Sequence, residues 1–371
     1  MADVLGELLA DLRVLVECES PSSDLAAVAR SADVVARVGT ARLGVTPERI
    51  VLDGRTHLRW RLGTGPSRVL LLGHHDTVWP LGSLAAHPFT VEDGVLRGPG
   101  CFDMKAGLVM AFHAAAGLDG VTLLVTGDEE LGSPSSRELI EEEARSAVAA
   151  LVLEASADGG ALKTERKGVS LYEVRVTGRA AHAGLEPEKG VNATLELAHQ
   201  VLAVSALADQ EAGTTVTPTS ARAGTTTNTV PAAGSFAVDV RARTAAEQER
   251  VHRAITALSP VLPGALIEVA GGVNRPLLEA VASAALHQRV RETAQRLGLP
   301  ATGSASFGGQ SDGNFTAGIG TPTLDGLGAV GGGAHAADEH VLVGVVTRED
   351  ALLRALVQQL VAHDRPLTRT S

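Results

Sequence analysis

The sequence predicts an α/β protein with a doubly wound, mostly parallel sheet and an inserted ferredoxin-like α+β domain. Short apolar runs that end on polar residues alternate with helical stretches, which is typical of a parallel sheet. From about residue 168 the order becomes strand-helix-strand-strand-helix-strand, the ferredoxin-like arrangement. The first pattern resumes at residue 277. Since 371 residues can form two cores, we expect one domain of residues 1–167 and 277–371 and an inserted domain of 168–276.

The first domain is predicted to begin with two helices, at residues 3–17 and 23–39, the second opened by a Ser-Ser-Asp cap signal. The strands that follow are short and apolar, as strands buried on both faces are. We expect strands at 50–52, 57–62, 69–72, 121–126, 149–153 and 322–324, a hairpin at 89–96, and helices at 104–118, 136–144, 277–297 and 347–362.

The inserted domain is predicted from alternating rather than continuous apolar patterns. Residues 169–177 alternate as a half-exposed strand does. The remaining elements are expected as a helix at 190–207, strands at 215–227 and 235–243 separated by a turn at 231–234, a helix at 244–258 and a strand at 266–269.

Composition excludes several classes of protein. The hydrophobic fraction is 44% and the charged fraction 20%, which describes a globular chain. The net charge of −11, without a stripe of Lys and Arg, argues against nucleic-acid binding. Cys18 and Cys101 are too few for a disulfide framework and fit a reducing compartment. No signal peptide and no apolar run long enough to span a membrane are found, so we expect a cytoplasmic protein without membrane contact.

Residues suited to metal binding follow the predicted strands. His74 and Asp76 come directly after the strand at 69–72, where a histidine could bind a metal while the carboxylate orients its ring. The alternative for this segment alone is a strand end exposed to water, with a histidine whose ring is hydrogen-bonded and binds no metal. Further metal-type residues lie at strand ends or in glycine-rich loops: Asp103, Glu129, Glu130, Glu154 and His335. Mixed nitrogen and oxygen ligands of this kind predict a two-metal hydrolase.

Two neighbouring ions need a bridging group, which the carboxylate of Asp103 could supply. The adjacent Glu129 and Glu130 suggest a division of roles, because successive side chains of an extended segment point in opposite directions. One of them would bind metal and the other would act as a base. The residues themselves do not decide which does which.

Five segments together resemble the co-catalytic zinc aminoacylase/carboxypeptidase family, which includes acetylornithine deacetylase, succinyl-diaminopimelate desuccinylase and carboxypeptidase G. They are Gly73-His74-x-Asp76-Thr77-Val78, Gly98-x-Gly100-x-x-Asp103-Met104-Lys105-x-Gly107, Asp128-Glu129-Glu130-x-Gly132-Ser133, Glu154 and Ala334-His335-x-x-x-Glu339-x-Val341. The resemblance is strongest to glutamate carboxypeptidases of the carboxypeptidase G type. Three further segments favour that subgroup: Arg179-Ala180-Ala181-His182-Ala183-Gly184, Asn228-Thr229-Val230-Pro231 and Asn274-Arg275-Pro276.

The resemblance implies two zinc ions, with cobalt or manganese as possible substitutes, and a role for each site residue. Asp103 would bridge the ions, with His74 and Glu154 on one ion and Glu130 and His335 on the other. Asp76 would orient His74, and Glu129 would be the general base and later the acid.

Substrate binding is also implied by the resemblance. His182 would stabilise the oxyanion, in this family often from the partner subunit, so a homodimer through the inserted dimerisation or lid domain is expected. Asn228 and Arg275 would hold the carboxylate of the substrate, for which arginine geometry is suited. Ser311 is expected at the substrate end of the cleft, although Gly309-Gln310-Ser311-Asp312 departs from the commoner Gly-Gly-Thr/Ser-Asp.

The expected activity is cleavage of an amide bond next to a free carboxylate in a small peptide or an N-acyl amino acid. A carboxypeptidase that releases a C-terminal amino acid, glutamate in the closest subgroup, is the first interpretation. An N-acyl-amino-acid deacylase of the acetylornithine deacetylase type is the alternative, because only the acyl side differs. A catalytically silent metal-binding relative and a transferase using the same metals are further hypotheses; Glu129 argues against the former.

Overall fold

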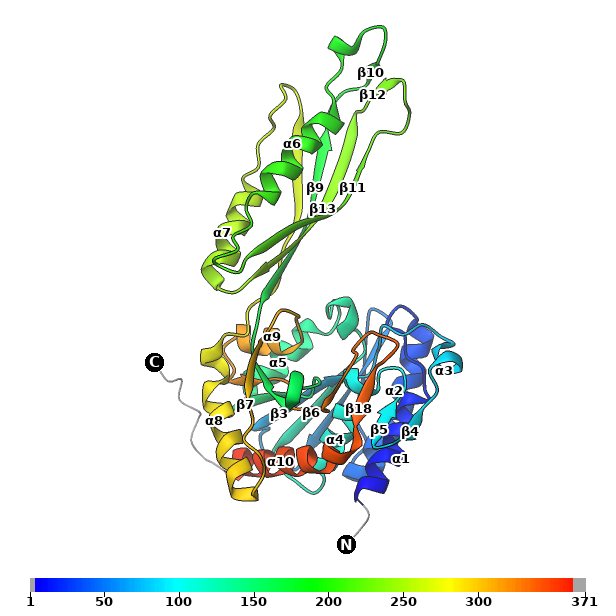
Figure 1. Ribbon diagram of the computed structural model, residues 1–371, viewed down its shortest axis with the longest axis vertical. Coiled ribbons are helices and arrows are strands. Elements are labelled where there is room, and N and C mark those ends of the chain that lie inside the picture. The colour runs from blue at the N-terminus through cyan, green and yellow to red at the C-terminus, as the bar shows by residue number, and fades with distance from the viewer. Residues whose placement is uncertain (1–3, 363–371) are drawn as a thin grey trace. The chain divides into compact units, whose positions relative to one another are not determined.

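The computed structural model describes residues 4–362, which form two compact units (Figure 1). Unit 1 contains the chain up to Arg166 and from Leu278 onward, and unit 2 contains Lys167–Leu277. Of the helix expected at residues 3–17, Asp3 lies outside the described residues. Within 4–362, every helix is too short or too polar to cross a membrane.

Unit 1 is built on a six-stranded, mostly parallel sheet, as the sequence predicts. Its order is β1-β2-β6-β3-β7-β16. The bounds are Glu48–Leu52 (β1), Arg55–Leu62 (β2), Val121–Thr126 (β6), Val69–His74 (β3), Ala149–Val152 (β7) and Thr323–Leu324 (β16). Strand β3 lies parallel to both β6 and β7, and β16 is parallel to β7, whereas β1 and β2 are antiparallel additions. The carboxyl ends of β3, β6 and β7 therefore meet at one edge, where ligands bind in such sheets.

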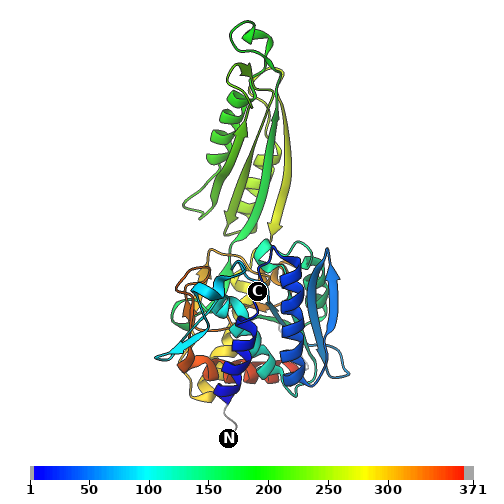
Figure 2. The ribbon, with the colours of Figure 1, turned by 90° about the vertical axis from the view of Figure 1, so that its right-hand side faces the viewer.

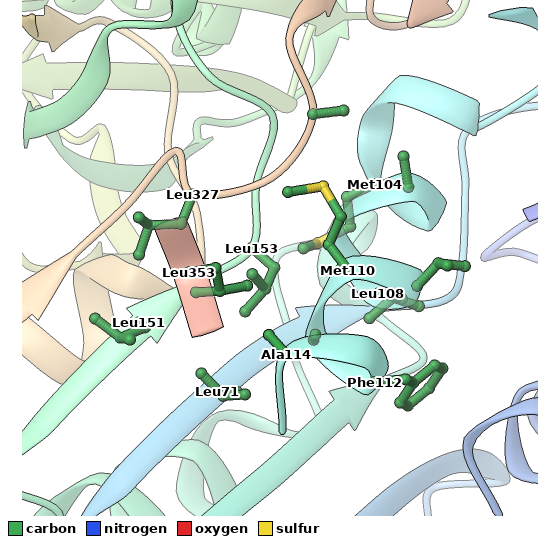
Figure 3. Close-up of a cluster of buried hydrophobic side chains, with 14 of the residues drawn as sticks. Leu71, Met104, Leu108, Met110, Phe112, Ala114, Leu151, Leu153, Leu327 and Leu353 are labelled. Atoms are coloured by element: carbon green, nitrogen blue, oxygen red, sulfur yellow. The ribbon is translucent and has the colours of Figure 1, made fainter. Parts of the chain in front are cut away.

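Helices cover both faces of this sheet, because the strand side chains alternate between the faces. Leu71 packs into the larger core and Leu70 and Leu72 into the smaller one. Figure 3 shows Leu71 and its neighbours in the larger core. The helices of the larger core are α1 (Val4–Val16), α2 (Leu25–Leu43), α4 (Ala106–Ala115), α8 (Ala280–Leu297) and α10 (Val343–Ala362), and those of the smaller core are α5 (Arg137–Ser146) and α9 (Gly313–Gly318).

Helix α4 lies directly against the end of strand β7, at Gly107. A Cβ atom at this position would stand only 2.1 Å from the carbonyl oxygen of Leu153, so glycine is required for the close approach. The irregular turn Cys101–Lys105 (η1) leads into this helix and carries Asp103. The contact thus places Asp103 beside the segment that continues into Glu154.

Short elements complete unit 1. Strands β17 (Gly331–Gly332) and β18 (His340–Leu342) form an antiparallel hairpin whose loop carries His335. The short elements after β3 and β6 are α3 (Ser83–Ala86), β4 (Thr90–Glu92), β5 (Val95–Arg97) and the turn η2 (Glu129–Leu131). A separate parallel pair joins β8 (Leu162–Arg166) to β15 (Ser304–Phe307), with a short turn, η3 (Asp158–Gly160), ahead of β8.

Unit 2 has the ferredoxin-like arrangement that the sequence predicts. Its antiparallel sheet has the order β11-β13-β9-β14. The bounds are β9 (Gly168–Thr177), α6 (Ala193–Ser205), β11 (Thr215–Ala223), β13 (Ala233–Ala242), α7 (Ala245–Thr256) and β14 (Leu266–Arg275). Both helices pack on one face of the sheet (Figures 1 and 2). Beyond the end of β9, a small pair joins β10 (Ala181–His182) to β12 (Thr229–Val230), followed by the turn η4 (Pro187–Lys189).

The structure differs from the sequence-based elements mainly where strands are short or polar. Strands β8 and β15 were not predicted, because neither has a clear apolar alternation. Strand β14 continues to Arg275 rather than ending at residue 269, and α10 begins at Val343 rather than at residue 347. Helix α4 begins at Ala106 because residues 101–105 form the turn η1.

Candidate two-metal site

His74 ends strand β3 with its ring fixed and one nitrogen free to bind a metal. Its Nδ1 lies 2.9 Å from the carbonyl oxygen of Asp76, which can only accept, so Nδ1 carries the proton and donates it. Nε2 is then the unprotonated atom of the neutral ring. It faces Asp103 Oδ1 at 3.4 Å and Glu154 Oε1 at 3.6 Å. This is the orientation that a metal-binding histidine takes from its second hydrogen bond.

Asp103 lies between the two histidines, with one carboxylate oxygen directed to each. Oδ1 is 3.4 Å from His74 Nε2, and Oδ2 is 3.3 Å from His335 Nε2. Glu130 lies on the far side, with Oε2 3.2 Å from His335 Nε2. The structure therefore brings together all five predicted ligands, with Glu154 beside His74 and Glu130 beside His335.

The donor set fits two divalent cations. The Nε2 atom of His74 is buried and makes no hydrogen bond of good geometry to any residue within 4–362. Burial disfavours a charged ring, yet the neighbouring Asp103, Asp76 and Glu154 raise the pKa of His74 well above its ordinary value. Hydrogen bonds from the His335 ring to Asp103 and Glu130, which accept them, likewise raise the pKa of His335 to about 10. Clustered carboxylates thus favour positive charge at both positions, which bound metals would supply.

Asp76 organises the segment after β6 as well as His74. Its Oδ1 accepts a hydrogen bond from the backbone N–H of Glu129 at 3.2 Å, and its Oδ2 accepts one from that of Glu130 at 3.3 Å. Ser22 Oγ also donates to Oδ2 at 2.6 Å. This fully buried carboxylate therefore fixes both glutamates relative to His74.

The two glutamates share His74 as a neighbour and differ in their other neighbours, although they lie in the turn η2 and not in the extended segment that the sequence suggested. Glu129 offers a carboxylate oxygen within 4.8 Å of ligand atoms of both His74 and Glu154. Glu130 instead groups with His74 and Asp103 and contacts His335. The next histidine, His75, points away from the site, since Nε2 lies 3.0 Å from the carbonyl oxygen of Thr56.

Glu339 is a site residue to which the sequence analysis assigned no role. Its buried carboxylate accepts hydrogen bonds from the backbone N–H groups of Gly100 (2.9 Å), Phe102 (2.8 Å) and Asp103 (3.0 Å) and from Trp79 Nε1 (2.6 Å). It therefore ties the turn that carries Asp103 to the loop that carries His335. Its position four residues after His335 was a signal that could have indicated this role.

Two of the substrate-binding candidates lie together in unit 2. His182 pairs with Thr229 across β10 and β12, and the N–H of Ala183 donates to the carbonyl of Asn228 at 2.9 Å. The His182 side chain is exposed.

Arg275 lies at the other end of the unit 2 sheet. It is paired with Val169 at the start of β9, whereas His182 follows Thr177 at its end. Eight residue steps separate Val169 from Thr177, which corresponds to roughly 26 Å of strand. Arg275 is buried, and its carbonyl accepts a hydrogen bond from Gln248 Nε2 at 3.0 Å. Within one chain, then, Arg275 is far from both His182 and Asn228.

Ser311 lies in unit 1, buried beside a buried ion pair. Its Oγ donates to Asp325 Oδ2 at 2.5 Å, and the same carboxylate oxygen accepts from Arg166 Nε at 2.6 Å. The hydrogen bonds described for Ser311 are thus made with other residues of the protein. A substrate contact for this residue stays a prediction.

A mostly parallel α/β sheet with two histidines and four carboxylates gathered at the carboxyl ends of its central strands and on neighbouring turns is typical of a metal-dependent hydrolase. Residues 70–359 match the peptidase family M20/M25/M40, and the chain belongs to this family. It is 31% identical over 300 residues to carboxypeptidase G2 of Pseudomonas sp. (strain RS-16), covering 76% of this chain and 71% of that relative. The protein is therefore an M20-family metallopeptidase related to carboxypeptidase G2.

Solved structures share the fold. The aminopeptidase PepT from Bacillus cereus superposes with a TM-score of 0.71 at 20% identity, covering 96% of this chain and 99% of that one. A dinuclear metal-binding M20 peptidase from Bacillus subtilis superposes with a TM-score of 0.66 at 16% identity, covering 98% and 100%. Peptidases with different specificities thus share this architecture, so specificity has to be argued from the site.

Proposed function

We propose that this enzyme is a two-zinc carboxypeptidase that cleaves the amide bond next to a free carboxylate in a small peptide or an N-acyl amino acid. Cobalt or manganese could replace zinc. The observation that carries the proposal is the Asp103 carboxylate, whose two oxygens face His74 and His335. A carboxylate in that position suits a bridging ligand, and the flanking Glu154 and Glu130 complete the two terminal sets.

The residues divide the chemistry among them. Bound metals supply Lewis-acid polarisation of the scissile carbonyl. Glu129, held by the Asp76 hydrogen bond to its backbone, removes a proton from the attacking water and returns it to the leaving nitrogen. His182 donates a hydrogen bond to the developing oxyanion. Asn228 and Arg275 hold the substrate carboxylate, with Ser311 at the end of the substrate cleft.

The unit 2 sheet supports a homodimer in this proposal. A substrate that contacts His182, Asn228 and Arg275 cannot reach all three in one chain, because about the length of β9 separates Arg275 from the other two. A second copy that contributes His182 and Asn228 resolves the conflict. A cytoplasmic location completes the proposal, supported by Cys18 and Cys101, which are both free thiols.

Hydrolysis of matched substrates tests the proposed reaction. Zinc-loaded protein should cleave peptides and N-acyl amino acids with a free terminal carboxylate about 10–100-fold better, in kcat/KM, than their amides, because a charge-assisted contact is lost. Glu129→Gln should lower kcat by about 10²–10⁴-fold without loss of metal. Metal loss in that variant would make Glu129 a ligand, and full activity in thoroughly chelated protein would exclude the proposal.

Complementation tests the shared site. Glu129→Gln and His182→Ala chains, each nearly inactive, are mixed and allowed to exchange subunits. About half the dimers are then mixed and hold one intact site each, so activity should recover to roughly a quarter of wild type. Differently tagged chains verify the exchange. No recovery despite exchange would place His182 in the site of its own chain.

A further inference from the structure

Lys163 is a buried residue whose ammonium group has no polar partner among the described residues. It lies on strand β8 and is only 6% exposed. Its Nζ stands 4.4 Å from the centre of the Phe307 ring, and within residues 4–362 it forms no hydrogen bond or ion pair. Burying a charge without a partner is costly. An ammonium group without a partner in the protein can bind an anionic group of a ligand.

Arg166 is a second cation beneath the same aromatic ring. Its guanidinium lies 5.4 Å from the centre of the Phe307 ring. Nε pairs with Asp325, and Nη1 donates to the carbonyls of Gly309 (3.2 Å) and Gln310 (3.1 Å). Nη2 is buried and has no partner among the described residues. Arg166 thus forms a direct ion pair with Asp325, whereas Lys163 forms none with any described residue.

Lys163 lies beside the metal site, within unit 1. A Cβ atom at Gly326 would be 3.3 Å from Lys163 Cγ and 3.6 Å from the carbonyl oxygen of Ala155, so Lys163 and the residue that follows Glu154 both lie against Gly326. Burial and the neighbouring Arg166 lower the pKa of Lys163, while the charges of Glu154, Asp325 and Asp103 raise it. Those opposing charges include two of the proposed metal ligands.

We propose that Lys163 is a specificity-determining residue that binds a second carboxylate of the substrate, with Arg166 as the positioning residue behind it. This inference rests on the proposed function, which assigns the carboxylate next to the scissile bond to Asn228 and Arg275. Phe307 forms the apolar wall over both cations. The preferred substrate is then a dicarboxylate, with its second acid either on the released amino acid or on the acyl group.

Matched pairs of substrates locate that acid. N-acetyl-L-glutamate is compared with N-acetyl-L-glutamine, and N-succinyl-L-alanine with N-succinamoyl-L-alanine. Lys163→Met should lower kcat/KM about 10–100-fold for the acid of one pair and less than about threefold for its amide. Lys163→Arg should retain most of the preference. The pair that responds identifies the side of the bond that carries the acid, and equal loss on acid and amide, or no loss, overturns the proposal.

Controls separate this inference from the proposed function. Arg145→Met removes one positive charge from an exposed side chain (62%) of α5. This variant should leave the ratio of kcat/KM for acid over amide unchanged in both substrate pairs. Thermal unfolding verifies that each Lys163 variant folds. If the wild type cleaves none of the four substrates, the proposed function fails for N-acyl amino acids. Calorimetry then compares the affinity of zinc-loaded protein for L-glutamate with its affinity for L-glutamine. The inference is overturned if Lys163→Met leaves the difference between these two affinities unchanged.

Discussion

The two halves of the metal site are built differently. His74 ends a central strand, is 1% exposed, and has its ring fixed by the Asp76 carbonyl. His335 lies on the loop between β17 and β18, has half its side chain exposed, and adopts a left-handed backbone with φ 64°. One half is therefore held by the central sheet, whereas the other depends on a loop. The difference predicts that the two halves respond differently to substitution.

The largest expected contrast is between His74→Ala and His335→Ala in metal-free protein. Removing the buried His74 ring leaves Asp76, Asp103 and Glu154 without their shared partner, so the free energy of unfolding should fall by about 2–4 kcal/mol. His335→Ala should cost less than about 1 kcal/mol, because its ring is half exposed. Urea unfolding in the presence of a metal chelator measures the free energy of unfolding of both variants. Equal losses would show that the loop is as integral to the fold as the strand.

Glu339→Gln should weaken the connection between the halves. An amide nitrogen cannot accept the hydrogen bonds that the carboxylate takes from the Asp103 turn, so the affinity for metal should fall about 10–100-fold. Chelator competition measures the affinity. Glu349→Gln is the matched control, since this carboxylate pairs with Arg348 on α10. An unchanged affinity in Glu339→Gln would limit that residue to a packing role.

A smaller effect is expected at Asp350, which shows what a buried carboxylate costs without a metal. Burial raises the pKa of Asp350 to about 6, against a weaker opposing effect of Arg354. The folded protein then holds a proton that the unfolded chain releases at about pH 4, so stability falls as the pH rises from about 4 to 6 and stays lower above it.

Asp350→Asn should accordingly raise the free energy of unfolding by about 1–3 kcal/mol at pH 7.5 and by little at pH 4. Denaturant unfolding at the two pH values measures this difference. An equal increase in the free energy of unfolding at pH 7.5 and pH 4 would mean that desolvation of the Asp350 charge is not the cause of the increase.

The sequence predicted the parallel sheet and the cluster of ligands because both depend on local patterns. Continuous apolar runs indicated β3, β6 and β7, and the strand topology then brings His74 close to Glu154. Residues whose role depends on packing between distant segments could not be predicted in this way. Glu339 acts through backbone groups more than 230 positions away in the sequence.

The substrate-binding predictions had a different limit. Motifs in the inserted domain led to the prediction of His182, Asn228 and Arg275 individually, but the motifs carry no information on strand register. The pairing of β9 with β14 alone reveals that Arg275 stands at the far end of the sheet. The sequence did not indicate that Lys163 and Arg166 contact one ring, because residues three apart in a regular strand point to opposite faces and the irregular pairing of β8 with β15 could not be predicted.

The contact between Gly107 and Leu153 bears on the proposed metal site. The turn that carries Asp103 leads into α4, and Glu154 directly follows Leu153, so this contact limits how far these two proposed ligands can move apart. The contact is made by a helix packed on a strand end, which is hard to deform. If the proposed ligands bind two ions, we expect ions of different radius to be accommodated on the exposed His335 side, where the loop between β17 and β18 can adjust.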